Sequence, residues 1–198
     1  MPEHVAIQDP DIHEPKGVAS AVAGARYVAD GAGSGGWDRV AGFGQYQDSK
    51  RTVGTPTQTL STGVRTQFIC DGGFLSLERL PSDASGSLWN TSTNKHVPIA
   101  EYDTYDLRVS FTAENYSGAA PYLEFELDIG GTPGVILKES RPLLKSGSAQ
   151  NFVYTWDVFV GDTYIANNGT LYITYVGTST CDIYANSIKI ERKFKDYT

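Results

Sequence analysis

Hydrophobic and polar residues alternate strictly along two stretches in the middle of the chain. In the stretch from residue 106 to residue 112, Leu107, Val109 and Phe111 share one side, and polar residues occupy the positions between them. The stretch from residue 122 to residue 129 repeats the pattern in LEFELDI. A period of two is typical of a β-strand with one face on a core. Both stretches therefore predict amphipathic strands.

Shorter apolar segments, separated by turn residues, predict further strands along the rest of the chain. They cover residues 63–70, 73–80, 97–100, 135–139, 151–160, 171–176 and 182–193. The turns between them carry Gly, Asn, Ser and Thr, and no helical period intervenes. Evenly spaced strands of this kind, about eight or nine in all, predict an all-β protein whose fold is an antiparallel two-sheet jelly roll.

The predicted strand 151–160 is apolar on parts of both faces. Phe152, Tyr154 and Trp156 share one face, while Val153 and Phe159 lie on the other beside polar residues. Two interpretations stay open. The strand packs against a sister subunit through its aromatic residues, or it packs only within its own core.

The first fifty residues differ in composition from the rest, with small-residue runs such as GVASAVAGA and GAGSGG. Pro15 is suited to the first position of a short helix, and Gly24 is suited to end it. Residues 26–30 and 37–40 predict a small hairpin, which would be marginal by itself. We therefore expect two parts: residues 1–50 form an extended arm with a short helix and a hairpin, and residues 51–198 form the jelly roll.

Charge excludes some partners. The 198 residues carry 16 Lys and Arg against 23 Asp and Glu, a formal net charge of −7. Phosphate backbones and anionic membranes repel such a chain, so we expect neither nucleic acid nor membrane as a partner. No apolar run approaches the roughly 18 residues that span a bilayer, and MPEHVAIQDP lacks the features of a signal peptide. We expect synthesis in the cytoplasm.

Motifs that suggest catalysis or nucleotide binding fail in their context. Gly31, Gly33 and Gly36 satisfy GxGxxG, but a strand-like segment follows them where a dinucleotide site requires a helix. Ser34 lacks the strand-to-helix setting of a nucleophile elbow. A flexible hairpin turn is the favoured interpretation, and we expect no enzyme. Two isolated cysteines predict buried thiols, which could bridge only if their strands are neighbours.

Two groups of acidic residues are candidate sites. Asp9, Asp11, His13 and Glu14 offer metal ligands, but Glu14 stands where a calcium loop requires glycine. An extended, proline-punctuated recognition segment is favoured there, with no metal or cofactor. The acidic row in LEFELDI could serve glycoside hydrolysis only if another acid faced it, so a solvated face is favoured.

Basic residues gather in the last predicted strand and the tail. They are Lys189, Arg192, Lys193 and Lys195, interleaved with acids. A solvated strand end is the simplest account of this cluster. An exposed contact with an acidic neighbour would contribute little.

The arm sequence resembles the amino-terminal module of tailed-bacteriophage head decoration and head-fibre proteins. The likeness covers residues 8–40 and is carried by DPDIHEPKGVASAVAG and by RYVADGAGSGGWDRV. The body resembles, by strand pattern only, the trimeric jelly roll of tumour-necrosis-factor and complement-type globular heads. The resemblance implies a head decoration (cement) protein or a head fibre.

The resemblance further implies where contacts are made. The arm would bind the major capsid protein on the outer surface of the virion, and three jelly rolls would associate as a homotrimer. The implied capsid-binding residues are Asp9, Asp11, Ile12, His13, Glu14, Pro15, Lys16, Gly17 and Val18. Hairpin contacts would come from Arg26, Tyr27, Trp37 and Arg39. Aromatic residues of the jelly roll would form the trimer seam, namely Tyr154, Trp156 and Phe159.

An alternative function belongs to another class, a head-fibre or tail-fibre adhesin. Its jelly roll would bind a host cell-surface glycan through aromatic side chains such as Tyr116, Tyr122 or Tyr164. The resemblance does not separate this alternative from decoration, because the loops of the body carry the distinction.

Overall fold

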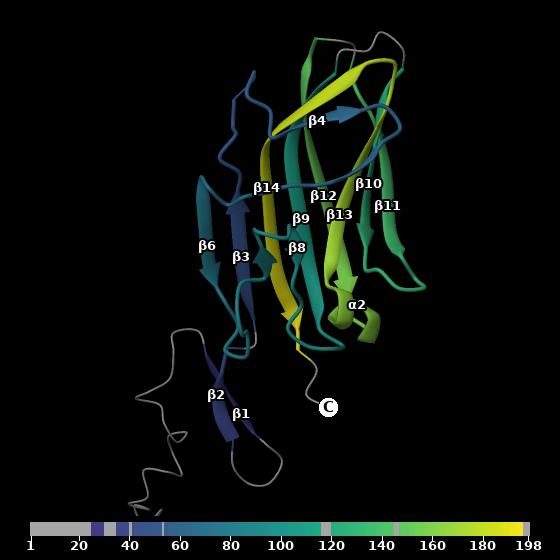
Figure 1. Cartoon of the computed structure of the whole chain (residues 1–198). Helices are drawn as coiled ribbons and strands as arrows, with labels where there is room; N and C mark the ends of the chain where they lie inside the picture. Colours follow the sequence, from purple (N-terminus) through teal and green to yellow (C-terminus); the bar gives the residue numbers. More distant parts are fainter. Residues whose placement is uncertain are drawn as a thin grey trace, which may run out of the picture.

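The computed structural model describes residues 25–29, 35–39, 41–52, 54–115, 120–144 and 147–195. Two antiparallel sheets face each other, and a small hairpin extends below them (Figure 1). The hairpin consists of β1 (Arg26–Ala29) and β2 (Gly35–Asp38). The predicted hairpin is thus present, whereas the predicted arm helix lies outside the described residues.

The first sheet, called here the β9 sheet, has the order β12-β9-β14-β3-β6, and β4 pairs with β14. Its strands are β3 (Gly42–Gln47), β4 (Gln58–Ser61), β6 (Leu75–Arg79), β9 (Thr104–Asn115), β12 (Ala149–Phe159) and β14 (Thr180–Phe194). The long strands β9 and β14 pair along most of their length and form the centre of the sheet.

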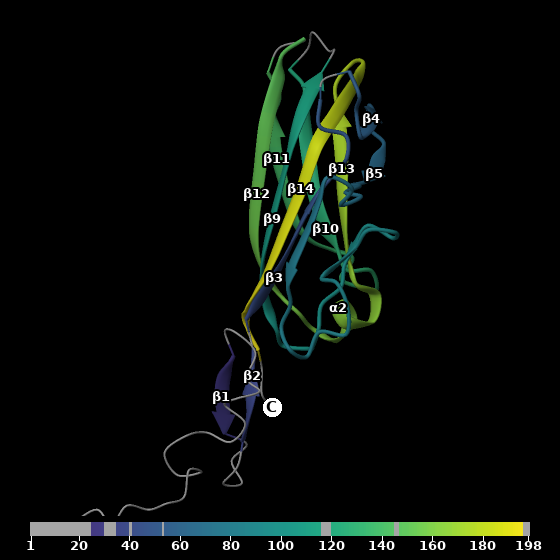
Figure 2. The ribbon, with the colours of Figure 1, turned by 90° about the vertical axis from the view of Figure 1, so that its left-hand side faces the viewer.

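The second sheet, called here the β10 sheet, has the order β11-β10-β13-β8-β7, and β5 pairs with β13. Its strands are β5 (Arg65–Gln67), β7 (Trp89–Asn90), β8 (Lys95–His96), β10 (Tyr122–Asp128), β11 (Val135–Pro142) and β13 (Gly169–Val176). The two sheets pack face to face as two layers, as the turned view shows (Figure 2).

The path of the chain between the sheets defines the fold. From β9 it crosses to β10 and β11, returns to β12, crosses again to β13 and returns to β14. Strands that are distant in sequence therefore lie side by side, with β14 between β9 and β3 and β10 between β11 and β13. This wrapping of antiparallel strands into two sheets is a jelly roll, which confirms the predicted fold class.

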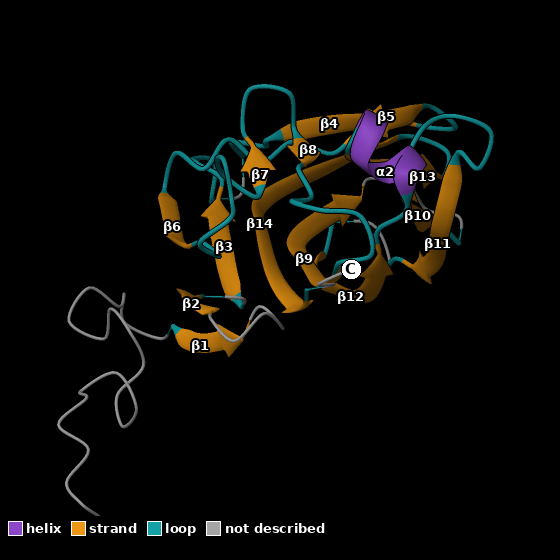
Figure 3. Cartoon of the chain, turned by 90° about the horizontal axis from the view of Figure 1, so that it is seen from below, coloured by secondary structure: helices purple, strands orange, loops and turns teal. Residues whose placement is uncertain are grey.

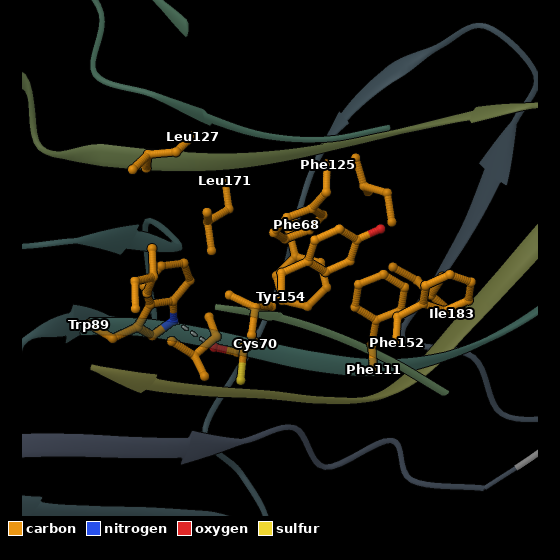
Figure 4. Packing of buried hydrophobic residues seen from close by; sticks show 14 of the residues in the cluster. Phe68, Cys70, Trp89, Phe111, Phe125, Leu127, Phe152, Tyr154, Leu171 and Ile183 are labelled. Atoms are coloured by element: carbon orange, nitrogen blue, oxygen red, sulfur yellow. Dashed lines mark hydrogen bonds between the residues drawn. The ribbon is translucent and has the colours of Figure 1, made fainter. Parts of the chain in front are cut away.

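Alternation along β9 and β10 places the predicted residues in the core between the sheets. Leu107, Val109 and Leu123 are buried with their neighbours, and aromatic rings fill the centre (Figure 4). Phe125 stacks on Tyr154 with ring centroids 4.7 Å apart. Each fully buried side chain of this size contributes about 1.5–3 kcal/mol to folding, so this core is the main source of the stability of the body.

Several strands depart from the sequence prediction. β3, β4 and β7 were missed, the strand expected at residues 97–100 ends instead at His96, and a short helix, α2 (Asp162–Asn167), joins β12 to β13 where none was expected. β3 pairs with β14 and β6, so residues 42–47 lie in the β9 sheet. Glycine suits that strand because a Cβ on Gly42 would lie 2.5 Å from the carbonyl oxygen of Arg79.

Both cysteines are buried free thiols, as the favoured interpretation predicted. Burial raises the pKa of the Cys70 thiol to about 12, and it raises the pKa of the Cys181 thiol to about the same value. Thiols of this kind are chemically inert, so they serve the core. The carbonyl oxygen of Cys70 accepts a 3.0 Å hydrogen bond from the Trp89 indole (Figure 4).

Candidate functional site

The segment predicted to bind the capsid, residues 9–18, lies outside the described residues. The structure does describe where the arm meets the body. There, β2 ends at Asp38. The chain then runs beside the loop that follows β6, and it enters β3 at Gly42. Seen from below, the hairpin lies beside the start of β3 (Figure 3). We call the contacts at this point the arm junction.

Backbone and hydroxyl hydrogen bonds form the first part of the arm junction. The Arg39 amide donates to Ser82 Oγ over 3.1 Å, and the Ser82 amide donates back to the Arg39 carbonyl over 3.0 Å. Ser82 Oγ also donates to the Asp38 carboxylate, and Arg39 Nη1 donates to the Leu80 carbonyl over 3.1 Å. These bonds fix the direction in which the hairpin leaves the body.

Alternating charges form the second part. Lys195 Nζ lies 2.8 Å from Asp38 Oδ2 and 3.0 Å from Asp83 Oδ2. Asp83 in turn lies 2.7 Å from Arg192 Nη1, and Arg192 Nη2 lies 2.7 Å from Asp103 Oδ1. The hairpin, the loop after β6 and the last strand are therefore joined through a continuous row of ion pairs.

The inner end of the row is buried. The side chains of Arg192 and Asp103 are both fully shielded from solvent. Asp103 Oδ2 also accepts a hydrogen bond from the Tyr105 hydroxyl, which itself accepts one from the Ile99 amide. A buried ion pair survives only with such additional hydrogen bonds, because desolvation of the two charges is costly.

The pKa values at the arm junction follow from these contacts. Burial alone would raise the pKa of Asp38, but hydrogen bonds from Lys195 and Ser82 outweigh it and lower that pKa below its usual value. Burial alone would likewise raise the pKa of Asp83, but hydrogen bonds from Arg192 and Lys195 outweigh it and lower that pKa below its usual value. Both carboxylates thus stay charged at neutral pH and hold the junction closed.

The basic carboxy-terminal cluster was predicted to be a solvated strand end, and this is wrong for Arg192. The inward side of β14 carries Ile188, Ile190 and Arg192 in alternation. The period of two that identified the strand would have placed Arg192 on the core side. Lys189 and Lys193 lie on the opposite side, where each pairs with Glu191.

An exposed aromatic patch lies next to the arm junction. Phe159 and Phe194 both pair with Thr104 across β12, β9 and β14, so the two rings flank one position on the outer face of the β9 sheet. Phe159 is 60% exposed and Phe194 is 59% exposed. Tyr102 lies 6.1 Å from Phe159 between ring centroids. We call Tyr102, Phe159 and Phe194 the aromatic patch.

The three residues predicted for the trimer seam are separated by the fold. Tyr154 is buried in the core of its own chain, so its assignment to a seam is wrong. Trp156 is half-buried against the core, where its ring lies 5.5 Å from Phe125. Phe159 belongs to the aromatic patch on the outer face. Successive residues of β12 point to opposite sides, and the β10 sheet covers only one of them.

The aromatic residues weighed for glycan binding are likewise separated. Tyr164 is buried, and its hydroxyl lies 2.7 Å from His96 Nδ1, so it is wrong as a surface contact. Burial lowers the pKa of His96 to about 3. Tyr122 is 36% exposed on β10, and Tyr116 lies outside the described residues.

The acidic row on β10 is neutralised by cations. Arg65 contacts Glu126 and Asp128 at 2.7 Å each, and Lys138 lies 3.0 Å from Glu124. Burial would raise the pKa of Glu126, but the hydrogen bonds from Arg65 and Lys138 lower it below its usual value. The general acid of a glycosidase needs a raised pKa, so this row is unsuited to that role.

Among the residues that the structure describes, no three His, Cys, Asp or Glu side chains gather closely enough to hold a metal ion. Within the same residues, no helix is long and apolar enough to cross a bilayer.

Comparison with solved structures gives distant likenesses. No protein-family model and no curated protein matches the chain. Eiger TNF from S. frugiperda is similar at 9% identity with a TM-score of 0.45, over 80% of this chain and 96% of that one. PRD1 vertex protein P5 is similar at 10% identity with a TM-score of 0.38, over 85% of this chain and 82% of that one. The fold assignment rests on the strand order of this chain.

Proposed function

We propose that this chain is a bacteriophage capsid decoration protein that binds the outer surface of the head as a homotrimer and stabilises the lattice of the major capsid protein. The resemblance of residues 8–40 to phage head proteins supports the class. The observation that carries the proposal is the arm junction, which fixes the hairpin at the same end of the jelly roll as the aromatic patch.

The position of the arm junction at one end of the body explains how the weak contacts of single arms add up to strong binding by a trimer. One short arm binds weakly, but three arms on one trimer act at high effective concentration on a three-fold site. This gain requires that all arms leave the trimer at the same end, since a linker that cannot reach its site contributes nothing. A junction held by ion pairs and hydrogen bonds meets that requirement because it limits the directions open to each arm.

The aromatic patch supports the trimer in the same proposal. Large exposed rings are uncommon on monomers, and aromatic side chains are enriched at interfaces. Phe159 retains the role predicted for it, and Phe194 and Tyr102 replace Tyr154 as its partners. The seam would then lie beside the arm junction and would hold three junctions close together.

Two measurements test the proposal. Light scattering of the full chain should give three times the 21.5 kDa mass of one chain. Phe159→Ser should shift the mass toward the monomer. Leu144→Ser is an exposed control next to Asn115, at the other end of β9, and should leave the mass unchanged. A monomeric wild-type protein at micromolar concentration would remove the avidity argument.

Deletion of residues 1–24 tests the capsid contact separately. The deletion leaves the hairpin, the arm junction and the core in place, so the shortened protein should remain a trimer with an unchanged melting temperature. Binding to isolated phage heads should be lost in a co-sedimentation assay. If the shortened protein decorates heads as well as the full chain, the arm is not the anchor.

A further inference from the structure

A polar hollow lies on the outer face of the β9 sheet, several residues along the strands from the aromatic patch. Its volume is about 290 Å³. Three cations and four neutral polar residues from β3, β9, β14 and the loop after β3 line it, namely Arg51, Arg108, Lys189, Gln45, Gln47, Ser110 and Ser187. None of the described residues that line the hollow is acidic, although the chain carries a net charge of −7.

Two of the cations are direct neighbours. Lys189 on β14 and Arg108 on β9 are opposite each other in the sheet, and their flanking partners are Gln45 and Thr155. Like charges directly opposite each other destabilise a sheet. The stability of the jelly roll therefore does not explain why Lys189 and Arg108 lie opposite each other.

The charges of the hollow are only partly compensated within the chain. Lys189 pairs with Glu191 at 2.9 Å, whereas Arg108 makes no ion pair with any residue that the structure describes. The Arg51 guanidinium lies 4.6 Å from the Phe74 ring centroid, and its enclosed Nη1 has no hydrogen-bond partner among the described residues. The guanidinium group of Arg108 thus lines the hollow without an ion-pair partner among the described residues.

The backbone beside the hollow is irregular. β14 carries a bulge between Tyr184 and Ser187, and Ala185, which also lines the hollow, has a φ of 56°. A left-handed conformation is costly for a residue with a Cβ, and such positions cluster at binding sites. Bulges likewise redirect side chains next to sites.

We propose that the hollow binds a saccharide that bears a carboxylate, of the size of one hexuronic acid ring. Arg108, Lys189 and Arg51 would hold the carboxylate, because guanidinium groups match its geometry. The glutamine amides and Ser187 would meet the sugar hydroxyls, and Phe74, which is 64% exposed beside Arg51, offers an apolar ring.

Size and overall charge select this ligand class. The volume lies at the lower end of the roughly 300–1,000 Å³ typical of small-molecule sites, which suits one ring rather than a long polymer. A chain with a net charge of −7 repels extended polyanions such as nucleic acids, but a single carboxylate in a local basic site is attracted at short range. The inference goes beyond the proposed function and does not depend on binding to a capsid.

Saturation-transfer NMR titrations of the full chain with glucuronate, glucose and acetate test the inference. We expect saturable binding of glucuronate, and binding at least about tenfold weaker for glucose, which lacks the carboxylate, and for acetate, which lacks the hydroxyls. Arg108→Gln and Lys189→Gln should each raise the dissociation constant for glucuronate about tenfold. Arg79→Gln removes an exposed cation on the same sheet outside the hollow and should change it less than about twofold.

Thermal melting shows that each variant is folded before it is titrated. The proposal is overturned if wild-type protein shows no saturable binding of glucuronate, or if Arg108→Gln and Lys189→Gln both bind it as the wild type does. Equal binding of glucose or acetate would also overturn it, since the combination of carboxylate and hydroxyls defines the ligand. Loss of the arm by deletion of residues 1–24 should leave the affinity for glucuronate unchanged, which separates this site from the capsid contact.

Discussion

Replacement of Arg192 by methionine tests whether the inner end of the arm junction supports the fold. The substitution keeps the length of the side chain and removes its charge from a position with no exposure to solvent. Asp103, equally buried, then loses the partner that lies 2.7 Å away. Breaking a buried pair in this way costs about 3–5 kcal/mol, because one charge stays buried without compensation. For a chain of 198 residues this corresponds to a fall in melting temperature on the order of 10 °C.

Urea unfolding at neutral pH, followed by tryptophan fluorescence, measures the effect. The double variant Arg192→Met with Asp103→Asn should recover part of the loss, since neither charge is then left alone, and the double-mutant cycle should give a coupling of roughly 0.5–3 kcal/mol. Lys193→Met on the exposed side of the same strand is the control and should change the unfolding free energy little. A cost below about 1 kcal/mol for Arg192→Met would refute the assignment of a supporting role to this pair.

Three further predictions concern other parts of the body. The pKa of His96 is about 3 in the folded chain and about 6.5 in the unfolded chain. Between these two pH values only the unfolded state binds the proton. The free energy of unfolding should therefore fall by up to about 1.4 kcal/mol per pH unit as the pH drops below 6.5. His96→Gln should remove that part of the slope in urea titrations at pH 6.5 and pH 4.5, and an unchanged slope would contradict it. Arg108→Gln should raise the unfolding free energy by about 0.2–1 kcal/mol because it relieves the repulsion from Lys189, and a destabilised variant would show that the pair is not in conflict. Gly42→Ala should lower the melting temperature by the equivalent of about 1–3 kcal/mol, because its Cβ would meet the backbone of β6, and a neutral result would mean that β3 adjusts freely.

Alternation in the sequence was a sound guide to strands that have one face on the core. β9 and β10 were predicted because their buried and exposed residues follow a strict period of two. β3 was missed because GFGQYQ carries two glycines that obscure the pattern: Gly42 fits a close approach to β6, and Gly44 lies against the ring of Tyr46. Local composition does not show which strand will lie beside another.

The candidate sites were less predictable because they depend on contacts between distant segments. Tyr154 and Phe159 occupy the same strand, and their sequence context does not reveal that the β10 sheet covers only the side of Tyr154. The arm junction joins Asp38, Asp83 and Lys195 across more than a hundred residues. Spacing in the sequence gives no indication of such a cluster before the fold is known.

The position of β3 directly after the arm junction has a mechanical consequence. Tension on the arm is transmitted along β3, whose long axis points toward the hairpin (Figure 1). The hydrogen bonds that β3 makes with β14 on one side and β6 on the other run across this direction, so they are loaded together in shear rather than peeled one by one. We therefore expect β3 to resist being pulled out of the body by tension on the arm far better than its modest length would suggest.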